Sequence, residues 1–151
     1  MGPRKELTGA AGEHYVAFEL SARGYAVGLT AQGTKNADLL VANLETGKSA
    51  TIQIKTMTSA FVRSKKYEPY WKWRVRVPEM PSETFLYAFV DLKGDISDSP
   101  DVFIVPSHEI LDLVGEWTDE KGKVSDSWLN IKKKDAEKYR DRWDVIEKVL
   151  A

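Results

Sequence analysis

The sequence ADLLVANLETGKSATIQIKT, residues 37–56, predicts a β-hairpin. Residues 39–44 form an apolar run, which is typical of a buried strand. Residues 45–48 are polar and contain a glycine, as expected of a hairpin loop. Residues 50–57 alternate between apolar and polar side chains, which indicates a strand with two different faces.

The alternation in the second strand gives this hairpin its functional interest. Ile52 and Ile54 share one face and can enter a core, while Gln53 and Lys55 emerge on the opposite face with Thr51. Asp38 stands at the start of the partner strand. We therefore expect a carboxylate, an amide and an ammonium group to converge at one end of the hairpin.

The composition limits the class of protein. A chain of 151 residues with 42% hydrophobic residues predicts a single domain, 1–151, with residues 1–8 frayed. No apolar run approaches the roughly 20 residues that a membrane span needs, so no membrane partner is expected. The chain has no cysteine, which excludes disulfides and thiolate metal sites and favours the cytoplasm as its location.

The remaining sequence predicts further helices and strands around the hairpin. Residues 9–23 suit a helix that ends at Gly24, where a glycine can cap it. Glu13 lies on the same helical face as Val16, Ala17 and Leu20, which we expect to be buried. A carboxylate in line with an apolar stripe either reaches solvent at the helix end or faces a polar site. The other expected elements are strands at 25–30, 70–77, 85–92, 102–105 and 128–131 (an edge strand), helices at 107–114 and 134–150, and a polar loop at 116–127.

Charge is unevenly distributed, although the net charge is only -1. Residues 61–77 contain six basic residues and one acidic residue, a net charge of +5, whereas residues 91–126 contain ten acidic and three basic residues, a net charge of -7. A chain polarised in this way can present a basic face to a nucleic acid, or simply two solvated faces. The basic residues are Arg63, Lys65, Lys66, Lys72, Arg74 and Arg76. The last three alternate with Trp71, Trp73 and Val75 and should form one outward row.

Four segments share a pattern with a known group of enzymes: the helix with Gly12-Glu13, its end at Gly24, Ala37-Asp38-Leu39-Leu40-Val41, and Ile52-Gln53-Ile54-Lys55. Together they resemble the PD-(D/E)XK nuclease superfamily. This superfamily includes restriction endonucleases and archaeal Holliday-junction resolvases. The resemblance is best over residues 9–57. It implies an α/β restriction-endonuclease-like fold, in which a mixed central sheet is flanked by helices in the order α-β-β-β-α-β. An additional basic strand and a C-terminal helix would extend this core.

The resemblance also implies a metal-dependent endonuclease that hydrolyses phosphodiester bonds in DNA. Asp38 then corresponds to the metal-binding Asp, Lys55 to the motif's Lys, and Glu13 to a helix carboxylate found in some members. Gln53 stands where the family usually has Glu or Asp. The implied ligands of Mg²⁺ or Mn²⁺ are Asp38, Glu13, Gln53 and the main-chain carbonyl of Ile54. Such a hard cation accepts oxygen ligands, and one or two carboxylates suffice because it keeps several waters.

Three functions remain open at this point. Asp38, Lys55 and Glu13 favour the endonuclease. Gln53 favours a nucleic-acid-binding module that kept the fold without catalysis, or a protein-interaction domain. Lys72, Arg74 and Arg76, with the three basic residues before them, are the expected contacts to DNA phosphates. Because many members of the superfamily act as dimers, a homodimer is a further option that the resemblance implies.

Overall fold

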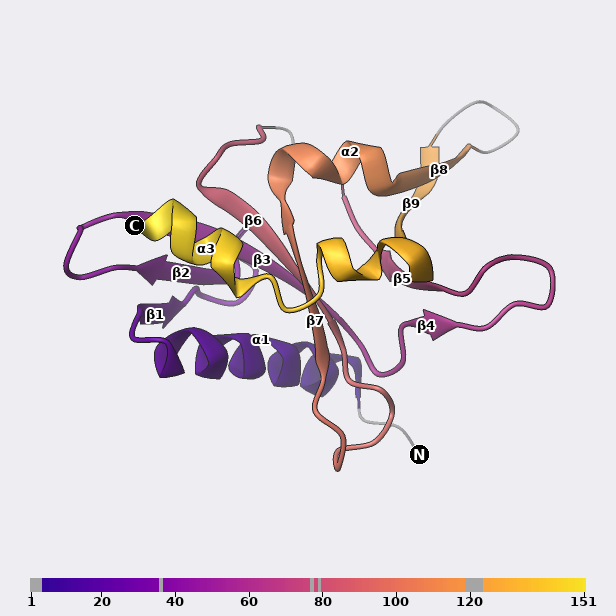
Figure 1. The fold of residues 1–151 in the computed structure, drawn as a ribbon, viewed down its shortest axis with the longest axis horizontal. Coiled ribbons are helices and arrows are strands. Elements are labelled where there is room, and N and C mark those ends of the chain that lie inside the picture. The colour runs from indigo at the N-terminus through magenta and orange to yellow at the C-terminus, as the bar shows by residue number, and fades with distance from the viewer. Residues whose placement is uncertain (1–3, 36, 77, 79, 119–123) are drawn as a thin grey trace.

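The computed structural model describes residues 4–35, 37–76, 78, 80–118 and 124–151, which form two β-sheets and their flanking helices (Figure 1). Within these residues, no helix is both long and apolar enough to cross a membrane. The helical elements are α1 (Lys5–Ala22), η1 (Ser107–Glu109), α2 (Ile110–Leu113), η2 (Lys133–Lys138) and α3 (Trp143–Leu150). The strands are β1 (Ala26–Leu29), β2 (Leu39–Ala42), β3 (Ser49–Met57), β4 (Phe61–Val62), β5 (Tyr70–Arg74), β6 (Phe85–Asp91), β7 (Asp101–Pro106), β8 (Val114–Thr118) and β9 (Val124–Lys132).

The larger sheet, sheet A, has five strands in the order β1-β2-β3-β6-β7. Strands β2 and β3 form the predicted antiparallel hairpin, with Leu39 in register with Ile52. Strand β3 then pairs in parallel with β6, and β6 pairs antiparallel with β7. The sheet is thus mixed and helices flank it, so the expected α/β fold class is confirmed.

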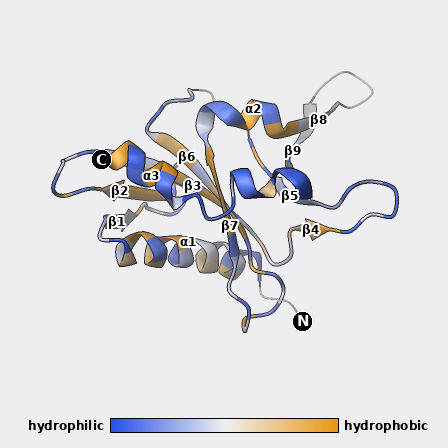
Figure 2. Ribbon diagram, viewed as in Figure 1, coloured by the Kyte–Doolittle hydropathy of each residue, from blue (hydrophilic) through white to orange (hydrophobic). Residues whose placement is uncertain are grey.

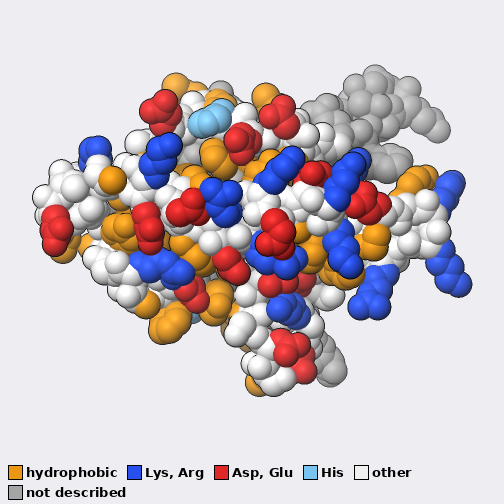
Figure 3. Space-filling model, in the orientation of Figure 1, with side chains coloured by type: hydrophobic (Ala, Val, Ile, Leu, Met, Phe, Trp, Pro, Cys, Tyr) orange, Lys and Arg blue, Asp and Glu red, His pale blue; other side chains and the backbone are white. Residues whose placement is uncertain are grey.

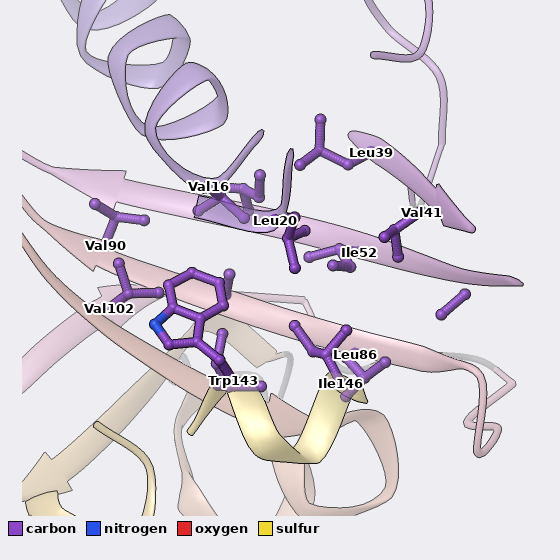
Figure 4. Close-up of a cluster of buried hydrophobic side chains, with 14 of the residues drawn as sticks. Val16, Leu20, Leu39, Val41, Ile52, Leu86, Val90, Val102, Trp143 and Ile146 are labelled. Carbon is purple, nitrogen blue, oxygen red and sulfur yellow. The ribbon is translucent and has the colours of Figure 1, made fainter. Parts of the chain in front are cut away.

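The helices α1 and α3 cover one face of sheet A. Figure 4 shows Val16 and Leu20 of α1 and Trp143 and Ile146 of α3 converging on the central strands, where Ile52 is fully buried. Along α1, hydrophobic and hydrophilic residues alternate in bands (Figure 2), as expected of a helix that is buried on one side only. The predicted inward faces are therefore confirmed for Val16 and Leu20 of α1 and for Ile52 and Ile54 of β3, whereas Ala17 is only partly buried.

The second sheet, sheet B, has the order β4-β5-β9-β8 and packs on the other face of β6 and β7. Trp73 of β5 lies with its ring centroid 5.4 Å from that of Phe89 and 5.4 Å from that of Phe103. Its indole N–H donates to the carbonyl oxygen of Val90 at 3.0 Å, so the one polar atom of this buried side chain is satisfied. Sheet B leaves the β1–β3 part of this face open, where Leu40 is 51% exposed.

The path between β3 and β6 passes through the predicted basic strand. The core order that the resemblance implies has a helix directly after the third strand, whereas the described residues between β3 and β6 form β4 and β5, and the next helix, α2, follows β7, as the elements read from the sequence predicted. The chain therefore passes through sheet B before it returns to the centre of sheet A. This detour places the basic strand β5 beside the end of β3.

Three sequence predictions about element bounds were wrong. The first helix begins at Lys5, so residues 5–8, expected to be frayed, are helical. The expected loop at 116–127 overlaps β8 and β9, and β9 is an inner strand of sheet B instead of an edge strand. The expected helix at 134–150 is divided into η2 and α3, because Asp141 adopts a positive φ of 52°. Its N–H donates to the Val102 carbonyl, which ties this break to β7.

Candidate active site

Asp38 lies at the point where β2 and β3 separate. Leu39 is the residue of β2 that registers with Ile52, yet the N–H of Asp38, one residue earlier, donates to the Ile52 carbonyl oxygen at 2.9 Å. Such a shift by one residue is typical of a β-bulge, which re-aims a side chain and is common beside active sites. The carboxylate of Asp38 turns back toward β3, where its Oδ2 accepts the N–H of Ile54 at 2.7 Å.

This hydrogen bond also orients the main chain of Ile54. Because β2 has ended, the Asp38 carboxylate occupies the place of a strand carbonyl. The N–H and C=O of one strand residue point to the same side, since paired residues exchange both bonds. The carbonyl of Ile54 therefore faces the same gap as Asp38. A carboxylate and a main-chain carbonyl border this break in the sheet.

Glu13 approaches the same break from α1. The preceding residue, Gly12, is buried, and a Cβ added there would overlap Oγ1 of Thr56 and lie 2.8 Å from its Cβ. The helix can approach β3 this closely only because residue 12 is a glycine. Burial raises the pKa of Glu13, the charge of Asp38 raises it further, and His14 acts in the opposite direction. The two carboxylates are thus close enough to interact.

The position of Glu13 settles one alternative that the sequence left open. A solvent-exposed Glu13 at the helix end is excluded, because α1 begins at Lys5 and Glu13 lies well inside it, partly buried. The favourable interaction with the helix N-terminus is confined to the first turn and does not apply here. Glu13 instead faces a polar break in the sheet.

Gln53 and Lys55 lie on the face of β3 opposite α1. Gln53 registers with Tyr87 and Lys55 with Phe89, both of β6, and both side chains are partly buried. On their other side, β2 has already ended. The structure therefore brings the four predicted side chains to one break in sheet A, with Glu13 on one face, Gln53 and Lys55 on the other, and Asp38 at the break itself.

The side chain of Lys55 also lines a groove of about 660 Å³ between β3 and sheet B. Four cations line this groove, Lys5, Lys55, Arg74 and Arg76, and its other lining residues are Thr56, Met57, Trp73, Val75, Ser127 and Trp128. No Asp or Glu is among these described lining residues. A groove with four cations and no carboxylate attracts anions such as a phosphate backbone.

The basic row on β5 has the predicted alternation. Trp71, Trp73 and Val75 are buried, whereas Arg74 and Arg76 are exposed. Lys72 is partly buried, because its Nζ lies 4.1 Å from the centroid of the Trp128 ring. The strand itself ends at Arg74, and Val77, the last residue of the expected strand, lies outside the described residues.

The structure does not bring Arg63, Lys65 and Lys66 to the groove. They lie in the connection between β4 and β5, which joins the end of β5 opposite to Arg74. Arg63 lies over the ring of Phe61 at 5.8 Å, and Lys66 over the ring of Tyr67 at 5.5 Å. Figure 3 shows Lys and Arg side chains on this part of the surface. Contact between these three residues and DNA stays a prediction.

The oxygen donors at the break fit a hard divalent cation. Asp38, Glu13, the Ile54 carbonyl and the Gln53 amide oxygen are the ligand types that Mg²⁺ or Mn²⁺ prefers. In the part of the chain that the structure describes, no group of three or more His, Cys, Asp or Glu side chains could hold a metal. The two carboxylates suffice for Mg²⁺, because this cation keeps several of its waters and needs few protein ligands.

Sequence reasoning missed two residues of the groove. Lys5 was assigned to a frayed terminus, and no sequence signal links it to Lys55. Trp128 was assigned to an edge strand, although the alternation of Trp128, Asn130 and Lys132 with Leu129 and Ile131 already indicates two faces. Its proximity to the basic row depends on the pairing of β5 with β9, which are distant in sequence.

Comparison with known proteins supports the fold. No family model matches the sequence, and no curated protein matches it. Among solved structures, a bacterial homing endonuclease, I-Ssp6803I, is similar with a TM-score of 0.63 at 15% sequence identity. The match covers 99% of this chain and 95% of that one. The chain therefore has a nuclease-like fold over its whole length.

Proposed function

We propose that this protein is a metal-dependent endonuclease that hydrolyses phosphodiester bonds in DNA, with its active site at the break between β2 and β3. The observation that carries the proposal is the meeting of Asp38 and Glu13 at this break beside Lys55, where a groove of four cations begins. The similarity to a homing endonuclease adds support, because that protein has the same fold.

The residues of the chain have separate roles in this proposal. Asp38 and Glu13 would hold the divalent cation, with oxygens of Ile54 and Gln53 as further donors. When bound, the cation binds phosphoryl oxygens and makes hydroxide available at neutral pH. Lys55 orients the attacking water and offsets negative charge on the phosphate. Arg74, together with its neighbours in the groove, holds the phosphodiester backbone.

Gln53 favours a second function. The amide supplies one neutral oxygen at the position where nucleases of the PD-(D/E)XK superfamily, which the motif resembles, usually have a carboxylate, so a cation would be held less tightly. A chain that kept the groove and lost the cation would be a DNA-binding module without cleavage. This second function predicts DNA affinity without any product, whatever the Mg²⁺ concentration.

Cleavage of supercoiled plasmid DNA tests the proposal. The wild type should nick or linearise the plasmid in Mg²⁺ or Mn²⁺ and lose this activity in excess EDTA. Asp38→Asn should be inactive, because it removes the charge and keeps an oxygen that can accept the Ile54 N–H. Asp98→Asn is the matched control: it makes the same chemical change at an exposed loop residue and should cleave like the wild type.

Two outcomes would reject the endonuclease. Cleavage by Asp38→Asn at the wild-type rate would show that the nuclease activity has another source. A wild type that binds the plasmid and leaves it intact at every Mg²⁺ and Mn²⁺ concentration would establish the DNA-binding module.

A further inference from the structure

The outer face of sheet B has an unusual composition. Along the stretch where β5 pairs with β9, from Tyr70 to Arg74 and from Trp128 to Lys132, the side chains that point away from the core are those of Tyr70, Lys72, Arg74, Trp128, Asn130 and Lys132. They comprise three cations, two aromatic residues and one amide, and none of them is acidic. A face that only meets solvent normally mixes both signs of charge. The described stretch from Tyr70 to Arg74 and from Trp128 to Lys132 is complementary to a polyanion that also offers aromatic surfaces.

Trp128 is central to this face. Tryptophan is mostly buried in folded proteins, and Trp71, Trp73 and Trp143, the other tryptophans whose side chains the structure describes, are buried here. Trp128 is only partly buried, and Lys72 covers its ring with Nζ 4.1 Å from the centroid. Its register neighbour on β8 is Gly115, which contributes no side chain beside the ring.

The ammonium group of Lys72 has an alternative acceptor nearby if it leaves the Trp128 ring. Its register neighbour on β9 is Asn130, whose Oδ1 is buried and has no hydrogen-bond partner among the described residues. A buried acceptor without a donor is unfavourable. An ammonium group displaced from Trp128 can turn to this oxygen or to a phosphate. The face of the indole then becomes available to another flat ring.

We propose that the outer face of sheet B binds single-stranded DNA, with Trp128 and Tyr70 stacking on bases and Lys72, Arg74 and Lys132 holding phosphates. This proposal rests on the proposed function and deepens it. It names the substrate as DNA that carries an unpaired segment next to the duplex that is cut. Arg74 and Trp128 also line the groove at Lys55, so the two surfaces are continuous.

The chemistry of the face favours an unpaired strand over a duplex. A base inside a duplex offers only its edge to a protein, whereas an unpaired base offers its whole face to an aromatic side chain. Stacking is tolerant of sequence because every base has such a face. An alternating row of aromatic and basic side chains on a sheet is therefore suited to unpaired bases.

Binding to three labelled probes separates stacking from charge attraction. The probes are a thymidine 12-mer, a 12-mer of the same backbone without bases, and a 12-base-pair duplex, measured by fluorescence anisotropy at one low salt concentration. The wild type should bind the thymidine probe more tightly than the abasic probe by about 5- to 150-fold for each stacked base. Trp128→Ala should lower the affinity for the thymidine probe by the share of one stacked base, about 5- to 150-fold, and leave the affinity for the abasic probe unchanged.

Two further variants keep this test decisive. Trp128→Tyr retains an aromatic ring and should restore most of the affinity lost in Trp128→Ala. Phe18→Ala removes an aromatic residue that is 65% exposed on α1, away from sheet B, and should bind like the wild type.

The proposal is overturned if the wild type binds the thymidine and abasic probes equally, or fails to bind both. It is also overturned if Trp128→Ala binds like the wild type, or if Trp128→Tyr is as weak as Trp128→Ala. If the wild type cleaves the plasmid but gives any of these binding results, the proposed endonuclease is supported and the single-stranded DNA surface is rejected. Base-dependent binding without plasmid cleavage would support the face and reject the endonuclease.

Discussion

The close packing of Gly12 against Thr56 should make Gly12→Ala destabilising. A Cβ at residue 12 would lie 2.8 Å from Cβ and 2.9 Å from Cγ2 of Thr56, besides overlapping its Oγ1. Rotation of Thr56 cannot relieve the contact with its own Cβ, so α1 must move away from β3. Overpacking of this kind costs about 1–3 kcal/mol. Movement of α1 would also carry Glu13 away from Asp38.

Gly9→Ala provides the matched control, because Gly9 also lies in α1 and a Cβ there meets nothing within 4 Å. Both changes improve helix propensity by about 1 kcal/mol, so the difference between the two variants isolates the packing term. Urea unfolding should show Gly9→Ala as more stable than the wild type and Gly12→Ala as less stable than Gly9→Ala by about 1–3 kcal/mol. Equal stability of the two variants would refute the close approach of α1 to β3.

Three further changes test the site. Gln53→Glu adds a charged oxygen donor and should tighten Mg²⁺ binding in calorimetry; unchanged affinity would show that residue 53 does not coordinate the cation. Changing Lys72, Arg74 and Arg76 together to Ala should weaken duplex binding and lower its log-log salt slope by about 0.9 for each lost phosphate contact, whereas an unchanged slope would exclude this row. The pKa of Glu13 is raised by folding, so its protonated form favours the folded state below pH 4.5, and this contribution is lost as the pH rises through the folded pKa. Glu13→Gln should therefore raise the free energy of unfolding more at pH 7 than at pH 4 in urea titrations without metal; the opposite trend would contradict burial of this carboxylate.

Local patterns in the sequence predicted the hairpin and its faces correctly. Ile52 and Ile54 are buried and Gln53 and Lys55 are on the other face because strand periodicity alone decides this arrangement. The burial of Val16 and Leu20 follows from helical periodicity in the same way. These predictions depend only on residues that are close in the chain.

The predictions that failed depend on contacts between distant residues. Tyr139 and Trp143 have helical spacing, but the Tyr139 carbonyl oxygen accepts a hydrogen bond from the Ile104 N–H at 2.8 Å, which uses the open edge of β7 and interrupts the expected helix. Unpaired strand edges are commonly covered in this way. Likewise, β9 became an inner strand because β5 and β8 pair on its two sides.

The sequence predicted which residue types form the candidate site, but it did not predict how their side chains are arranged. The sequence placed a carboxylate at residue 38 near the strand of Lys55, yet the bulge that turns Asp38 onto the Ile54 N–H depends on where β2 ends. Likewise, Lys5 joins the groove only because α1 starts four residues earlier than its helical signal indicates.

Isothermal titration of Mg²⁺ into the protein is the most direct test of the claim that Asp38 and Glu13 form one cation site. The wild type should bind Mg²⁺ at neutral pH and bind it more weakly toward acidic pH, because the raised pKa of Glu13 makes protons compete with the cation. Asp38→Asn should lose this binding, while Asp98→Asn keeps it. Identical Mg²⁺ heats for the wild type and Asp38→Asn would contradict the site.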